Sequence, residues 1–87
     1  MACYIITYDL KEGGQYEPLY EAIKSYKTWA HIQESVWAVV SNNKASQIRD
    51  HLSSFIDPKD RIFVIRSGSE AAWRNAICRS EWLKERL

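Results

Sequence analysis

Tyr4-Ile5-Ile6-Thr7-Tyr8-Asp9 is the stretch that decides the fold of this 87-residue chain. Its unbroken run of apolar, aromatic and β-branched residues predicts a buried β-strand. The strand delivers one carboxylate, that of Asp9, at its end. Because an ionised carboxylate beside a packed core is costly unless something pairs with it, its position calls for a metal ion, a hydrogen-bond donor or a functional role.

The residues after this strand predict a loop followed by a helix. The glycines at 13 and 14 permit positive φ and release the chain from the sheet, and Pro18 suits the first turn of a helix. Apolar residues then recur at spacings of three and four, which predicts a helix with one face on the sheet. The residues of that face are Tyr16, Leu19, Tyr20, Ile23 and Tyr26.

Residues 29–41 are rich in β-branched and aromatic residues and predict two further strands. The polar interruption Gln33-Glu34-Ser35 lacks the Asn-Gly or Asp-Gly pair of a tight hairpin, so a bend, a bulge and a turn all remain open there. Asn42-Asn43 then offers an N-cap for a second amphipathic helix, which the pair Asp57-Pro58 ends.

The remainder of the chain predicts a last strand and a C-terminal helix. Residues 61–66 form an apolar run with arginine at both ends, which is typical of a strand. Ser67-Gly68-Ser69-Glu70 resembles a capping box, so we expect a helix to follow it. The apolar residues of that helix are Trp73, Ala76, Ile77, Leu83 and Leu87.

The order β-α-β-β-α-β with an added C-terminal helix is typical of an α+β ferredoxin-like sandwich, here a single domain over residues 1–87. Two helices cover one face of its antiparallel sheet, so the C-terminal helix or a second subunit has to cover the other. The chain holds four Trp, five Tyr and two Phe, and some of these rings are expected at an interface. We therefore expect a homodimer.

Charge and cysteine content narrow the class of protein. Twelve basic and eleven acidic side chains give a net charge of +1, so no strong field attracts nucleic acid or an anionic membrane. Cys3 and Cys78 form neither a CxxC pair nor a disulfide framework, which fits a reducing compartment. No stretch approaches the roughly 18 consecutive apolar residues of a membrane span, and no leader is evident. We expect a cytoplasmic protein without a membrane partner.

Three segments together resemble the small CRISPR-associated adaptation protein Cas-two and its VapD-type toxin relatives. They are the first strand (residues 4–10), Gln33-Glu34-Ser35-Val36-Trp37 against the family's Gln-x-Ser-Val-Phe, and the last strand (residues 60–66). The ending, Glu70-Ala71-Ala72-Trp73-Arg74 with Trp82-Leu83-Lys84, is more similar to the uncharacterised SinR-like small proteins near that superfamily.

The resemblance implies a homodimer in which Asp9 faces its twin across a cleft and shares a divalent metal ion. In the better-known relatives such a site is linked to cleavage of RNA or DNA, or to a structural adaptor role. This chain departs from the relatives at the head of the first helix, where Lys11-Glu12-Gly13-Gly14 and Glu17 replace a polar loop with arginines. That departure weakens the expected grip on a nucleic-acid backbone.

Asp9 is the candidate metal ligand, because Mg²⁺ is commonly held by one or two carboxylates together with phosphates and water. The alternative is a loop acid that accepts hydrogen bonds from Lys11 or from backbone N–H groups. His31 is a candidate general acid or base, and Ser35 a candidate hydrogen-bond donor to a phosphate. Both lie close to Asp9 only if the second strand pairs beside the first. Otherwise His31 caps an exposed strand face and Ser35 occupies a bulge.

Lys11, Arg66 and Arg74 are the candidate nucleic-acid-binding residues. Arg66 and Arg74 could join Arg61 and Arg79 in a basic patch, against the alternative of a scattered, charge-compensated surface. The resulting hypothesis is a Mg²⁺-dependent endonuclease or endoribonuclease that acts as a homodimer. The alternative is a non-catalytic dimeric module that binds protein or nucleic acid.

Overall fold

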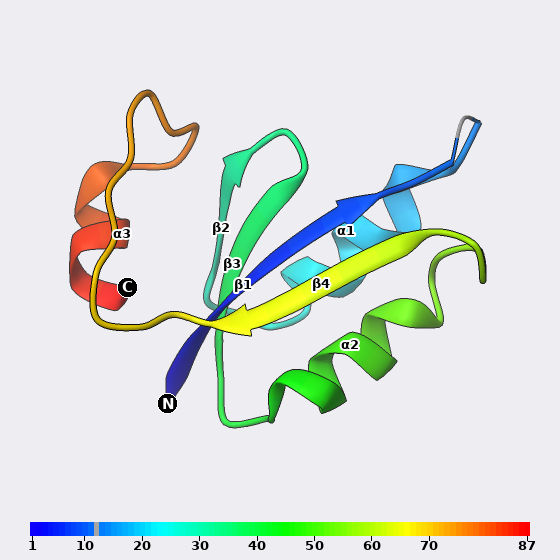
Figure 1. Cartoon of the computed structure of the whole chain (residues 1–87), viewed down its shortest axis with the longest axis horizontal. Helices are drawn as coiled ribbons and strands as arrows, with labels where there is room; N and C mark the ends of the chain where they lie inside the picture. Colours follow the sequence, from blue (N-terminus) through cyan, green and yellow to red (C-terminus); the bar gives the residue numbers. More distant parts are fainter. Residues whose placement is uncertain (12) are drawn as a thin grey trace.

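The computed structural model describes residues 1–11 and 13–87, and it confirms the expected order of elements. The elements are β1 (Ala2–Asp9), α1 (Tyr16–Lys24), β2 (Trp29–Gln33), β3 (Val36–Ser41), α2 (Ala45–Ser53), β4 (Arg61–Arg66) and α3 (Ser80–Arg86). The strands form one antiparallel sheet in the order β2-β3-β1-β4, so β1 lies between β3 and β4 (Figure 1). This is the ferredoxin-like α+β arrangement.

One face of the sheet forms the larger core with α1 and α2. Alternate residues of β1, namely Tyr4, Ile6 and Tyr8, point into this core, as the period of two in a strand requires. They pack with Trp37, Val39, Leu19, Ala22, Ile23, Ile48 and Leu52. Of the stripe predicted for the first helix, Leu19 and Ile23 are buried and Tyr20 packs against this core. Tyr16 is 42% exposed and Tyr26 lies beyond the end of α1.

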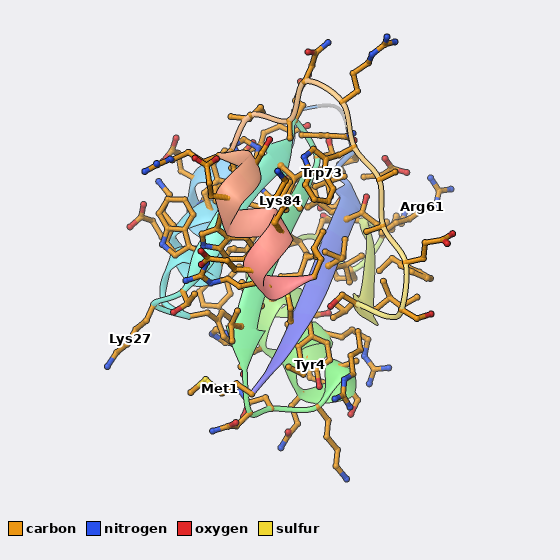
Figure 2. The ribbon with its side chains drawn as sticks, turned by 90° about the vertical axis from the view of Figure 1, so that its left-hand side faces the viewer. Met1, Tyr4, Lys27, Arg61, Trp73 and Lys84 are labelled. Carbon is orange, nitrogen blue, oxygen red and sulfur yellow. The ribbon has the colours of Figure 1, made fainter. Side chains whose placement is uncertain are left out.

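The opposite face is covered in part by the chain's own C-terminal segment. Leu83 of α3 is 1% exposed and packs with Cys3, Ile32 and Ala38 of the sheet. Figure 2 shows α3 crossing this face with Trp73 beside it, while Arg61 lies apart at the β4 side. Phe63 and Ile65 of β4, on the same face, stay exposed to water.

The C-terminal helix is much shorter than the sequence predicts, because α3 begins only at Ser80. Ser67 does not cap a helix, since its N–H donates to the carbonyl oxygen of Cys3 at 2.8 Å and extends the β4–β1 pairing. The N–H of Ile77 donates to the carbonyl oxygen of Ile32 at 2.8 Å, which ties the segment to the edge of β2. Pairing with the sheet thus overrides the helical propensity of residues 70–79.

Both ends of α2 differ from the sequence prediction, and the connection between β2 and β3, left open above, becomes definite. The N-cap of α2 is Lys44, not Asn42-Asn43, and the N–H of Lys44 donates to Oε1 of Gln47 at 2.7 Å. The same helix ends at Ser53, before the Asp57-Pro58 pair. Between β2 and β3 the chain has both a two-residue turn at 34–35 and a register shift between His31 and Gln33. None of the helices described is long and apolar enough to cross a membrane.

Candidate functional site

Asp9 is the last residue of β1 and lies directly opposite Arg61 of β4. Because Tyr8 points into the helix-side core, the alternation of the strand places the Asp9 side chain on the opposite face. Both Asp9 and Arg61 are exposed. A hollow of about 560 Å³ opens at this end of the two strands, lined by Thr7, Tyr8, Asp9, Asp60, Arg61, Ile62 and Phe63.

The Asp9 carboxylate has no hydrogen bond or ion pair with any residue that the structure describes. Lys11, the donor considered for it above, is engaged elsewhere. Its Nζ lies 2.5 Å from Oδ2 of Asp57, and its backbone N–H donates to Oδ1 of Asp60 at 2.7 Å. The Asp9 carboxylate is therefore available to bind a ligand, whereas Asp60 is engaged by Lys11. Glu12, the other neighbour of interest, lies outside the described residues.

Asp57 and Asp60 hold the chain where it leaves β1. The hydrogen bond from Lys11 lowers the pKa of the Asp57 carboxyl, and one from the backbone N–H of Lys59 adds to this. Oδ2 of Asp60 accepts a hydrogen bond from the N–H of Asp57 at 2.9 Å, so both carboxylates serve the loop that precedes β4. These acids have a structural role that Asp9 lacks.

Asp57 gives a prediction about pH. Because its folded-state pKa is lowered, its contribution to stability is fully present above the ordinary value of 3.8 and is lost as pH falls through the folded-state pKa. Asp57→Asn should therefore show a weaker loss of stability below about pH 4 than the wild-type chain. Urea unfolding at several pH values measures this. Parallel acid dependence in the two proteins would contradict the role given to Asp57.

A buried hydrogen-bond chain attaches the β2–β3 turn to the end of β1. The backbone N–H of Tyr8 donates to the carbonyl oxygen of Ser35 at 3.3 Å. The hydroxyl of Tyr8 donates to the backbone carbonyl oxygen of Glu34 at 3.2 Å. The same hydroxyl accepts from Nε1 of Trp37 at 3.1 Å. Burial raises the pKa of the Tyr8 phenol well above its usual range, which extends the protonated, donating form of the hydroxyl to higher pH. Ser35 is thereby fixed beside Tyr8, the residue before Asp9.

Tyr8→Phe tests this chain of hydrogen bonds. The variant keeps the ring but leaves the indole N–H of Trp37 without its acceptor in the core, at a cost of about 2 kcal/mol. For a domain of this size the loss corresponds to a melting temperature lower by about 10 °C. Differential scanning calorimetry measures it, with Tyr26→Phe as a control because that hydroxyl bonds His51 at an exposed site. An unchanged melting temperature for Tyr8→Phe would contradict the assignment.

His31 is on the other face of the sheet from Asp9. Its ring stacks on that of Trp37, with centroids 4.0 Å apart and planes at 9°, and Trp37 belongs to the helix-side core. His31 was expected near Asp9 only if the second strand paired with the first, and it does not, because β3 lies between β2 and β1. The backbone of Ser35 lies beside that of Tyr8, the residue before Asp9, because β3 and not β2 pairs with β1.

The candidate basic residues do not gather around Asp9. Lys11 follows Asp9 closely in the chain but is paired with Asp57. Arg66 lies opposite Tyr4, and Tyr4 is five residues from Asp9 along β1, or about 17 Å at the usual rise of a strand. Arg74 is exposed in the irregular segment before α3. The cation that the fold places beside Asp9 is Arg61, which the sequence offered only as one member of a wider patch.

Within one chain, Asp9 supplies only part of the oxygen ligands that a hard cation such as Mg²⁺ needs. The residues described contain no group of three or more His, Cys, Asp or Glu side chains that could hold a metal ion. Each chain instead offers one exposed carboxylate, and Mg²⁺ is commonly held by one or two carboxylates with phosphates and water completing its shell. Two copies of Asp9 would therefore meet this requirement.

Comparison with known protein families finds one described as "CRISPR associated protein Cas2", whose model matches residues 1–75. The match spans all four strands and both helices of the larger core, and it ends before α3. It confirms the part of the resemblance drawn above that concerns the Cas-two family. The resemblance to VapD-type relatives, and the nearer likeness of the chain's ending to SinR-like proteins, stay predictions.

Proposed function

This chain belongs to the CRISPR associated protein Cas2 family, and we propose that it is a homodimeric, Mg²⁺-dependent endonuclease or endoribonuclease with Asp9 at its centre. Nuclease activity is known in this family, and its members typically form dimers and act on nucleic acids. The observation that carries the proposal is the exposed Asp9 carboxylate, which none of the described residues engages, at the open end of β1.

The dimer is supported by apolar surface next to this carboxylate. Phe63 and Ile65 of β4 are 59% and 51% exposed, and they share the face of Thr7 and Asp9. Phe63 lies opposite Thr7, only two residues or about 7 Å along the strand from Asp9. In a twofold dimer the same patch packs on itself, so burying these side chains brings the two Asp9 residues toward one axis.

The proposed roles follow from position. The two Asp9 carboxylates would hold the ion, and Arg61 of each chain would bind a phosphate oxygen of the substrate. Ser35, fixed beside Tyr8, is proposed as a further hydrogen-bond donor to the substrate. When bound, Mg²⁺ supplies positive charge to the scissile phosphate and lowers the pKa of its bound water. His31 is given no proton-transfer role, because its ring lies against Trp37 on the far face of the sheet.

Cleavage of labelled single-stranded and double-stranded RNA and DNA by the purified chain tests the proposal. We expect products with Mg²⁺ and none with EDTA, and activity that follows the fraction of dimer as the protein is diluted. A dimer that binds these substrates but cleaves none of them would support the alternative, a non-catalytic binding module.

A further inference from the structure

A second hollow lies at the edge of the sheet opposite to β4, between β2 and the C-terminal segment. It has a volume of about 310 Å³, near the lower end of the range for ligand sites. It is lined by Trp29, Ala30, His31, Ile77, Cys78, Arg79 and Trp82. The hollow exists because the irregular segment before α3 is tied to β2 by the hydrogen bond from Ile77 to Ile32.

Two indole rings from distant parts of the chain form walls of this hollow. Trp29 comes from β2 and is 37% exposed, and its ring is held against that of Trp37 with centroids 5.5 Å apart. Trp82 comes from α3, where it packs at the border of the smaller core. Ala30 contributes only a methyl group to the lining.

Cations surround these rings. Arg79 lines the hollow, the Nζ of Lys24 lies 5.5 Å from the centroid of Trp29, and the guanidinium of Arg86 lies 4.9 Å from that of Trp82. Glu81 and Glu85 oppose the two arginines at 3.5 and 3.4 Å, but these pairs are exposed and of a kind that contributes little. No acidic side chain is among the residues that line the hollow.

We propose that this hollow binds one unpaired base of a single-stranded RNA or DNA, stacked on Trp29, with Arg79 on a neighbouring phosphate. A base offers the flat π-face that an indole accepts, and its backbone offers the anion that the surrounding cations require. The bases of a duplex are already stacked on each other, so single strands are preferred. The inference depends on the proposed function only for the class of ligand, a nucleic acid.

Titration of the ¹⁵N-labelled chain with a short oligothymidylate tests this, because the four Trp side chains give separate indole N–H signals. We expect the signals of Trp29 and Trp82 to shift, and those of the buried Trp37 and of Trp73, which donates to Ser80, to shift far less. The duplex of the same length should leave all of them nearly unchanged. Shifts centred on Trp73, or equal shifts with the duplex, would overturn the proposal.

Variants of Trp29 supply the affinity test. Trp29→Leu should weaken binding of the oligothymidylate about tenfold or more. Trp29→Phe, which keeps an aromatic ring for stacking, should retain most of the wild-type affinity. Wild-type affinity in Trp29→Leu, with its fold intact by circular dichroism, would contradict the inference.

Failure of this inference can be told apart from failure of the nuclease proposal. Binding in the hollow should survive Asp9→Ala and the removal of Mg²⁺, because β3 separates Trp29 on β2 from Asp9 on β1. A chain that binds the strand through Trp29 but never cleaves it keeps the hollow and ends the nuclease proposal. A Trp29→Leu chain that cleaves at the normal rate and binds the strand with unchanged affinity would end the proposal for the hollow and keep the nuclease proposal.

Discussion

Asp9→Ala is expected to lower Mg²⁺-dependent cleavage at least about 100-fold, because each chain would lose the carboxylate proposed to hold the ion. Stability should change by no more than about 0.5 kcal/mol, since the exposed carboxylate has no partner among the described residues whose loss would be felt. The dimer should persist as well. Initial cleavage rates at several Mg²⁺ concentrations, together with thermal unfolding, measure all three effects.

Asp50→Ala is the matched control for Asp9. Asp50 is also an exposed aspartate, but it lies on α2 and its carboxylate pairs with Arg49 at 2.9 Å. The control should cleave at the wild-type rate. Full activity in Asp9→Ala, measured beside this control, would remove Asp9 from the mechanism and leave the chain without an identified metal ligand.

Phe63→Asp is expected to separate the dimer, because it places a charge in the middle of the apolar surface proposed as the interface. The dissociation constant should rise at least about 30-fold, the equivalent of a side chain that contributes 2 kcal/mol or more to an interface. Since Phe63 is 59% exposed within one chain, the monomer should fold normally. Cleavage should fall together with the dimer, although Asp9 is intact in every molecule.

Phe55 provides the control for this variant, because it is the other phenylalanine of the chain and is 39% exposed in the turn after α2. Phe55→Asp should leave the molar mass unchanged in light scattering. A Phe63→Asp protein that remains dimeric at the same concentrations would show that the two copies meet through another surface.

The C-terminal segment restricts where a second copy can pack. Leu83 and its neighbours cover the part of the sheet face formed by β1, β2 and β3 within the same chain. The uncovered apolar residues of that face are on β4, next to Asp9. Because the family match ends at residue 75, this cover is an addition to the matched region. The dimer proposed here accordingly uses the β4 side and not the whole face.

The sequence was sufficient for the element order because each main element has its own periodicity. The apolar run 4–8 and the spacing of Leu19 and Ile23 describe a strand and a helix without reference to the rest of the chain. The C-terminal helix was predicted too long for the opposite reason. Ser67 and Ile77 make hydrogen bonds to β1 and β2, and no local pattern reveals pairing with residues so distant in sequence.

The candidate site was predictable only in its central residue. Asp9 follows directly from its place at the end of a buried strand. Arg61 and Ser35 depend on strand register, which is set by long-range pairing and by the irregular pairing between His31 and Gln33. Alternation along the strand predicts that Trp29 and His31 share one face and Ala30 and Ile32 the other, but only the packing in the structure shows which face is that of Asp9.

In the proposed dimer, two Asp9 carboxylates meet across the twofold axis and share one metal ion. Anomalous diffraction from crystals grown with Mn²⁺, a cation that accepts the same oxygen ligands, tests it most directly. We expect one strong peak on the twofold axis within bonding distance of both carboxylates, with Phe63 of each chain buried beside it. Asp9 residues on opposite flanks of the dimer, with no metal between them, would contradict it.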